Sequence, residues 1–329
     1  MWGGVMGPLI RLRGEYPMQK SNLLPAVGAG FGLIVREPLS VLAWGLVYGV
    51  LTLGPLALFF SILGPGLIDF YRSAMTDPQS LSASPPAALM QAQAIQPLQL
   101  LGGLAAASII YPAIFRAVLT PEDRRWAYLR LGKTELFVAV ILIVLFVLLF
   151  VAMFIFLLVM IIPIGIGVGL AAGSGNGGMG VGMALLIFPL GLAAMIAFAY
   201  VFGRLWMGAP MTVAQRELRL FEGWTLTRGY GWSLVGMIVV IVLIVLVFEL
   251  LLIVALGAIG FASLGGVNGI EALFTADRWR TLIGPLIAGY LGFAFVIATV
   301  MQPIMIAPWA RAYQLIAGDK DVASGEVFA

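Results

Sequence analysis

Long apolar runs separated by short polar segments make up most of this chain. Each run covers about 20 residues or more, the length that an α-helix needs to cross roughly 30 Å of hydrocarbon. Backbone groups in lipid must be hydrogen-bonded within their own segment, so the runs are expected to be helices. The pattern predicts six transmembrane helices, at residues 38–63, 97–119, 136–162, 181–202, 233–262 and 282–305. The predicted fold class is therefore an all-α, polytopic membrane protein.

The polar segments ahead of the first, third and fifth runs share one pattern, an aromatic residue followed four or five residues later by an arginine. The aromatic residues lie 95 and 98 residues apart, and the pairs are Phe31 with Arg36, Trp126 with Arg130, and Trp224 with Arg228. A further arginine closes each unit, at Arg116, Arg204 and Arg311. This spacing predicts three parallel repeats of an interfacial amphipathic helix plus a transmembrane hairpin, over residues 21–119, 120–208 and 209–315.

Local signals place the predicted surface helices. The first is expected over Ser21–Arg36. Thr120 can cap a second helix that has Pro121 at its first position and acids in its first turn. Thr212 and Gln215 have the spacing of a capping box for the third.

A glycine-rich segment and two prolines are expected to interrupt helices. Residues 165–182 contain nine glycines among eighteen positions and no charge. A glycine-rich loop can hold phosphate, but no G-K-[ST] sequence is present, so a flexible linker is favoured. Pro303 and Pro308 are expected to kink or end the last transmembrane helix.

The repeats together predict a single membrane domain over residues 21–315. Residues 1–20 form an N-terminal extension, in which the charged residues follow the apolar start, so a cleaved signal peptide is rejected. Met18 is an alternative start to Met1. Residues 316–329 are a polar tail on the cytoplasmic side.

Composition supports the membrane class, and the distribution of charge predicts how the chain is oriented in the membrane. The chain is 62% hydrophobic and 10% charged, with a mean hydropathy of +1.08, whereas soluble domains carry roughly 25% charged residues. Fifteen of the eighteen Lys and Arg residues fall in the two end segments and the second and fourth connections. The positive-inside rule then places both termini in the cytoplasm, and the net charge of +3 indicates that membrane face, not a nucleic-acid partner. The repeats are related by an axis along the membrane normal.

The residue types that are absent restrict the chemistry. Without Cys or His the chain has no thiol catalysis, no disulfide, no zinc site with imidazole or thiolate ligands, and no Ser-His-Asp arrangement. With almost no acids inside the apolar runs, no nucleophile–base set is apparent. The chain is therefore predicted to be non-enzymatic, with no catalytic residue, metal or cofactor.

Glu249 is the one ionisable residue inside a predicted transmembrane run. A carboxylate there costs about 2.5–3.5 kcal/mol on insertion scales, which makes it a functional-site hypothesis, an ion or proton pathway. Counting from the helix ends at 1.5 Å per residue places Tyr290 at a similar depth. The favoured alternative is that Glu249 reaches water near the outer surface, or is protonated and bonded to Tyr290, because a proton-coupled carrier groups several polar residues.

Seven arginines are expected on the cytoplasmic side next to the membrane: Arg36, Arg124, Arg125, Arg130, Arg216, Arg219 and Arg228. Basic residues there attract anionic headgroups by about 1 kcal/mol each, although neighbouring acids offset part of this. The hypothesis is a modest preference for anionic lipid, with Arg130 and Arg228 reaching phosphate from equivalent positions. The arginines that close each unit are expected to snorkel to headgroups, and the tryptophans to form interfacial belts.

Three segments carry a family resemblance: R-A-V-L-T-P-E-D-R-R-W-A-Y-L-R-L-G (116–132), E-G-W-T-L-T-R-G-Y-G-W (222–232) and A-P-W-A-R-A-Y-Q-L (307–315). They resemble a group of uncharacterised bacterial inner-membrane proteins, common in alphaproteobacteria and similar in layout to YciC-like proteins and to the membrane domain of some glycerophosphodiester phosphodiesterases. The resemblance implies a bacterial inner membrane. The soluble phosphodiesterase domain is missing here, so no hydrolase activity is implied.

Two classes of function remain. The first is a non-catalytic integral inner-membrane protein that binds lipid or partner proteins, including other copies of itself, in envelope organisation. The alternative is a small-solute or lipid transporter that uses Glu249 as an intramembrane polar site.

Overall fold

This computed structural model describes residues 22–61, 87–174, 178–263 and 278–327, so the predicted N-terminal extension lies outside the described residues. Every regular element in that part of the chain is a helix. The elements are η1 (Leu24–Gly28), α1 (Ala29–Arg36), α2 (Pro38–Tyr48), η2 (Gly49–Leu53), α4 (Ala87–Leu119), η4 (Arg125–Tyr128), α5 (Lys133–Ser174), α6 (Gly178–Trp206), α7 (Gly208–Gln215), α8 (Glu222–Leu226), α9 (Gly231–Ser263) and α11 (Arg278–Val327). Residues 54–61 continue the line of η2 as α-helix.

Six helical stretches of the described chain are long and apolar enough to cross a membrane. They are Pro38–Ser61, Gln96–Leu119, Arg125–Ile161, Phe188–Gln215, Gly231–Ala258 and Ala288–Lys320. Each overlaps one of the six predicted runs, so the prediction of six long apolar helices and an all-α fold is confirmed.

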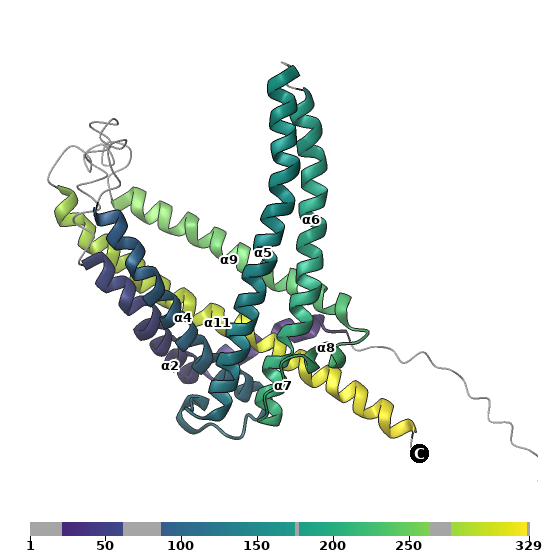
Figure 1. The fold of residues 1–329 in the computed structure, drawn as a ribbon. Helices are drawn as coiled ribbons and strands as arrows, with labels where there is room; N and C mark the ends of the chain where they lie inside the picture. The colour runs from purple at the N-terminus through teal and green to yellow at the C-terminus, as the bar shows by residue number, and fades with distance from the viewer. Residues whose placement is uncertain (1–21, 62–86, 175–177, 264–277, 328–329) are drawn as a thin grey trace, which may run out of the picture.

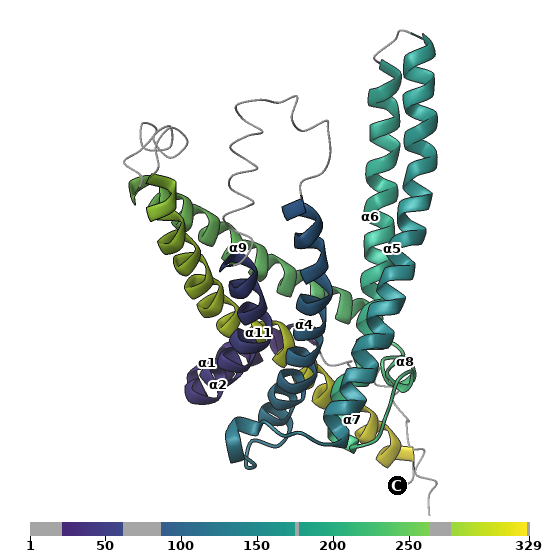
Figure 2. The same ribbon diagram turned by 60° about the vertical axis from the view of Figure 1, so that its left-hand side comes forward.

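The helices are packed at one end of the molecule and separate toward the other. α11 packs against α1, α2 and α4, while α5 packs against α4 and α6. In both views α5 and α6 run side by side and extend beyond the other helices (Figure 1, Figure 2). The largest fully buried side chains come from the end where α4 finishes and α5 and α9 begin, and they include Trp44, Phe115, Tyr128, Ile141 and Leu234. We call this the charged end, because most ion pairs described below lie there.

Small residues allow close contact between α2, η2, α4 and α11. A Cβ added to Gly102 in α4 would overlap the carbonyl oxygen of Leu51 in η2. A Cβ added to Gly45 in α2 would overlap the side chain of Thr299 in α11. Helices in an apolar medium associate through van der Waals contact, and glycine brings their backbones together.

The glycine-rich segment is mostly helical, so the prediction of a flexible linker over residues 165–182 is wrong. α5 continues to Ser174 and α6 begins at Gly178. Ile, Val, Leu and Ala separate many of the glycines, and a helix satisfies its own backbone groups where no water is available. The 42 residues of α5 extend about 63 Å at 1.5 Å per residue.

Two predicted helix starts are also wrong. Thr120 and Pro121 lead into a turn, and residues Trp126 to Tyr128 have left-handed backbone angles in place of a surface helix. Thr212 lies inside α7, which begins at Gly208, and its hydroxyl accepts a hydrogen bond from the backbone N–H of Arg219 at 3.0 Å. In the first place the distant residue Trp44 bonds the loop, and in the second the Thr212 hydroxyl bonds a residue beyond the end of the helix instead of capping its start.

The last helix continues through both prolines, so the prediction that it ends there is wrong, while a kink at either proline stays a prediction. α11 includes Pro303 and Pro308 and continues through the predicted tail to Val327. Both prolines and Trp309 are buried against other helices, and such packing stabilises a helix that contains proline. Trp309 is therefore part of the core and not of an interfacial belt.

The three predicted units begin differently. α1 precedes the first hairpin, the four residues of η4 precede the second, and the short helices α7 and α8 precede the third. The threefold repeat therefore stays a prediction.

Candidate functional site at the charged end

A left-handed turn organises the loop between α4 and α5. Trp126, Ala127 and Tyr128 have φ of 53°, 56° and 62°. Non-glycine residues in this region cost about 1–2 kcal/mol each, so other contacts must hold the turn. The indole Nε1 of Trp44 donates to the carbonyl of Ala127 at 2.8 Å, and Arg116 Nη1 donates to the carbonyl of Tyr128 at 2.9 Å. The turn buries the Tyr128 ring and leaves Trp126 88% exposed.

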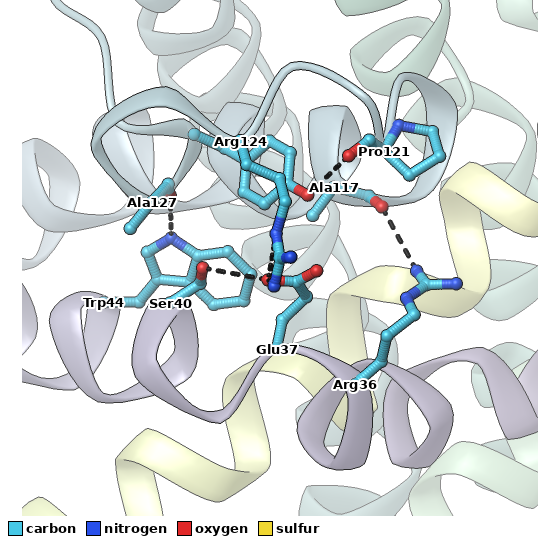
Figure 3. Close-up of polar contacts among 9 residues, drawn as sticks. Arg36, Glu37, Ser40, Trp44, Ala117, Pro121, Arg124 and Ala127 are labelled. Atoms are coloured by element: carbon cyan, nitrogen blue, oxygen red, sulfur yellow. Dashed lines mark hydrogen bonds and ion pairs between the residues drawn. The ribbon is translucent and has the colours of Figure 1, made fainter.

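Glu37 is a buried acid that pairs with this loop (Figure 3). Its carboxylate accepts hydrogen bonds from Arg124 at 2.6 and 3.0 Å and lies 3.5 Å from the Ser40 hydroxyl, which donates to it. The Glu37 side chain is 6% exposed, whereas that of Arg124 is 64% exposed. The hydrogen bond and the charge of Glu37 raise the pKa of Arg124 above its usual value. The pair links the α1–α2 junction to the loop after α4.

Arg36 makes a second link beside this pair. Its guanidinium donates to the carbonyl of Ala117 at 3.3 Å, while the Tyr128 hydroxyl donates to the carbonyl of Pro121 at 2.9 Å (Figure 3). The first bond joins α1 to α4, and the second is made within the loop that follows α4.

Arg116 and Arg204, which close the first two predicted units, are buried and bonded to protein groups. Arg116 forms an ion pair with Glu135, and both side chains are almost enclosed. Arg204 donates to the carbonyl of Trp224 at 2.6 Å and to the Thr227 hydroxyl at 3.1 Å. Its guanidinium carbon lies 3.7 Å from the centre of a Trp224 ring, a cation–π contact. The prediction that they snorkel to headgroups is therefore wrong for these two, while Arg311 is exposed and bonds Gln314.

The loop between α7 and α8 has its own pairs. Arg219 bonds Glu217 at 2.6 Å and Glu222 at 3.5 Å. Backbone hydrogen bonding, first of all from its own N–H, lowers the pKa of Glu222, and Arg219 lowers it further. Arg130 pairs with Asp123 in the same way in the loop after α4.

A buried tyrosine connects the start of α9 to the C-terminal part of α11. The Tyr230 hydroxyl donates to Asp319 Oδ2 at 2.7 Å. Burial, followed by the hydrogen bond and charge of Asp319, raises the pKa of Tyr230 to about 12.

A cleft of about 880 Å³ opens at the charged end between α4, the following loop, the start of α5 and the end of α7. We call it the basic cleft. Its charged lining residues are Arg116, Glu122, Asp123, Arg125, Arg130, Glu135 and Arg216. Arg116 and Arg130 are paired with Glu135 and Asp123. Arg125 and Arg216 are exposed and have neither an ion pair nor a hydrogen bond within the described chain, so they are available to an anion.

An apolar groove of about 700 Å³ lies farther along α4, between that helix, α5 and α6. Leu, Ile, Phe and Ala side chains form most of its lining. Gln96 and Gln99 lie toward one end along α4 and Tyr111 at the other, where Trp206 of α6 also contributes.

The structure divides the residues that the sequence suggested as sites. Arg125, Arg130 and Arg216 line the basic cleft. The others do not line it: Arg36 bonds the Ala117 carbonyl, Arg124 bonds Glu37, Arg219 bonds nearby acids, and Arg228 lies close enough to Lys320 for the two charges to interact. Arg130 thus lines the basic cleft and Arg228 does not, while their equivalence within the repeats stays a prediction.

Glu249 lies on α9 and Tyr290 on α11. Glu249 is exposed, and Tyr290 is half-exposed. Among the described residues no hydrogen bond joins them. Neither lines the basic cleft or the apolar groove.

Sequence reasoning missed the acids that organise the charged end. Glu37 and Glu135 each stand just before or at the start of a long apolar helix. An acid in that position, with an arginine at the end of a neighbouring helix, is a signal that could have identified the Arg116–Glu135 pair.

Comparisons with protein-family models, with curated proteins and with solved structures found no match. The resemblance of the chain to YciC-like proteins therefore stays a prediction.

Proposed function

We propose that this chain is a non-catalytic multi-pass membrane protein that binds anionic phospholipid at the basic cleft. The observation that carries the proposal is the placement of Arg125 and Arg216, from two separate loops, in one cleft at the ends of long apolar helices. Arginine suits phosphate because its guanidinium presents several donors in one plane.

The charge of the basic cleft favours an anion only moderately. Four arginines and three carboxylates line it, which leaves one positive charge. Because two of the acids are paired with Arg116 and Arg130, the charge that a ligand meets is that of Arg125, Arg216 and the single acid Glu122.

The membrane placement belongs to the same proposal. Both termini lie on the cytoplasmic side of a bacterial inner membrane, and the three units are parallel repeats. There the protein acts in envelope organisation, through lipid and through contacts with partner proteins or further copies. The alternative of transport through Glu249 gains no support, because Glu249 lies outside the groove lining.

The test is the amount of lipid that purifies with the protein. The double variant R125Q/R216Q removes both available arginines from the basic cleft. At about 1 kcal/mol for each arginine near a membrane surface, the loss of anionic lipid is several-fold and at most roughly 30-fold. Mass spectrometry of extracted lipid, per mole of protein, measures anionic against zwitterionic phospholipid.

The matched control is R228Q/R311Q, which makes the same change of charge at two exposed arginines outside the cleft. We expect this control to retain anionic lipid. Equal retention by both double variants would show that the cleft does not bind lipid.

A further inference from the structure

The basic cleft and the apolar groove lie one after the other along α4 and α5. The cleft includes Arg116 near the end of α4 and Glu135 near the start of α5. The groove begins at Tyr111 and Leu142 on the same two helices, five and seven residues farther from the charged end. At 1.5 Å per residue these steps are about 8 and 10 Å. The two cavities share no lining residue, but these short axial steps separate the polar lining from the apolar lining.

The length of the groove fits a hydrocarbon chain. From Tyr111 to Gln96 the groove follows fifteen residues of α4, about 22 Å. One leaflet contributes about 15 Å, half of the roughly 30 Å hydrocarbon core. An acyl chain that starts near Tyr111 therefore has apolar lining along its whole length.

Polar groups are present where the two parts meet. Tyr111 and Trp206 line the groove at its end nearest the charged end, and their rings are 6.0 Å apart. The indole Nε1 of Trp206 has no hydrogen-bond partner within the described residues. This nitrogen is buried inside the protein, so the polar groups that a lipid meets at this level are those of the groove surface and of the cleft beyond it.

We propose that the basic cleft and the apolar groove together bind one anionic glycerophospholipid. Its phosphate lies between Arg125 and Arg216, and one acyl chain lies along α4 in the groove. This inference rests on the proposed function and adds the lipid class and the role of the chain. The single positive charge of the cleft suits a headgroup with one negative charge, such as phosphatidylglycerol.

Gly103 provides a way to block the groove without touching the cleft. It lines the groove, and a Cβ added there meets no atom within 4 Å. Gly103→Phe therefore fills the space of the acyl chain without displacing the protein backbone. Gly257→Phe is the matched control, because Gly257 on α9 is exposed, is equally unobstructed and lies outside the groove.

The experiment titrates delipidated, detergent-purified full-length protein with phosphatidylglycerol, phosphatidylcholine and glycerol phosphate, and measures binding by native mass spectrometry. We expect Gly103→Phe to weaken phosphatidylglycerol binding about tenfold, because an occupied groove must repack to admit the chain. Gly257→Phe should leave that binding unchanged. R125Q/R216Q should weaken phosphatidylglycerol binding more than it weakens phosphatidylcholine binding.

The outcomes separate this inference from the proposed function. If R125Q/R216Q loses phosphatidylglycerol but Gly103→Phe does not, the headgroup site stands and the acyl-chain site is overturned. If glycerol phosphate binds wild-type protein as tightly as phosphatidylglycerol does, the cleft takes a free phosphoester and the lipid inference is overturned. If neither variant changes binding, both the inference and the proposed function are wrong. A melting curve of each variant confirms that it is folded.

Discussion

The α2–α4–α11 group and the α5–α6 pair are both built from long apolar helices but are packed very differently. In its most apolar 18-residue window α4 has 33% of its residues buried inside the protein, whereas the windows of α5 and α6 have 11%. Large side chains along the middle of α5, from Phe146 to Val159, are mostly exposed. α5, with a mean hydropathy of 3.6, is thus less buried than α4, whose mean hydropathy is 1.7.

The difference shows that hydrophobicity does not decide packing in a chain of this kind. An apolar side chain gains little by moving from lipid into the protein, since both surroundings are hydrocarbon. What the α2–α4–α11 group has in addition is close contact at two glycines, between Gly45 and the Thr299 side chain and between Gly102 and the Leu51 backbone. The charged end adds hydrogen bonds and ion pairs that fix the helix ends.

The largest expected effect comes from breaking that close contact. Gly102→Ala places a Cβ against the carbonyl oxygen of Leu51, so the two helices must move apart. Overpacking of this kind costs about 1–3 kcal/mol. Its neighbour in the chain, Gly103→Ala, has open space and should not lower stability. Thermal unfolding of the two proteins in detergent measures the difference, and equal melting temperatures would contradict the packing argument.

A second comparison tests the arginines that the sequence treats as equivalent. Arg204→Gln removes the cation–π contact with Trp224 and the charged hydrogen bonds to its carbonyl and to Thr227. Hydrogen bonds to charged groups contribute about 1.5–3 kcal/mol, so we expect a loss of about 2 kcal/mol. Arg311→Gln, at an exposed site, should stay within about 0.5 kcal/mol of wild type. Denaturation in detergent measures the free energy of unfolding of both variants. If Arg204 only reached toward lipid headgroups, the two variants would lose similar amounts of stability.

The smallest effect concerns the half-exposed ion pair. Arg124→Gln leaves the buried carboxylate of Glu37 without its cation, whereas Glu37→Gln leaves an arginine that already reaches water. Because solvent reaches Arg124, its loss costs less than the loss of one partner of a fully buried pair. Arg124→Gln should therefore destabilise more than Glu37→Gln. A double-mutant cycle measures the coupling energy between the two residues. A coupling energy of zero would show that this ion pair does not help to hold the loop.

Sequence patterns were most informative where one physical constraint acts alone. The six long apolar helices could be predicted because only helices satisfy their backbone groups in lipid. The basic cleft could be predicted in part, since Arg125, Arg130 and Arg216 were among the candidates and do line it. The ion pairs of Glu37 and Glu135 were missed, because their partners Arg124 and Arg116 lie 87 and 19 residues away.

The sequence alone determined the helical class and the approximate position of each long helix. Both follow from the length and hydropathy of each apolar run and do not depend on contacts with the rest of the chain. It also placed arginines beside the helix ends. Only the tertiary structure decided which arginines remain available. Thr120 and Pro121 carry a strong local signal for a helix, yet Trp44 and Arg116 bond the backbone of Ala127 and Tyr128 and hold a left-handed turn there. Several long-range contacts together outweigh a capping preference of about 1 kcal/mol.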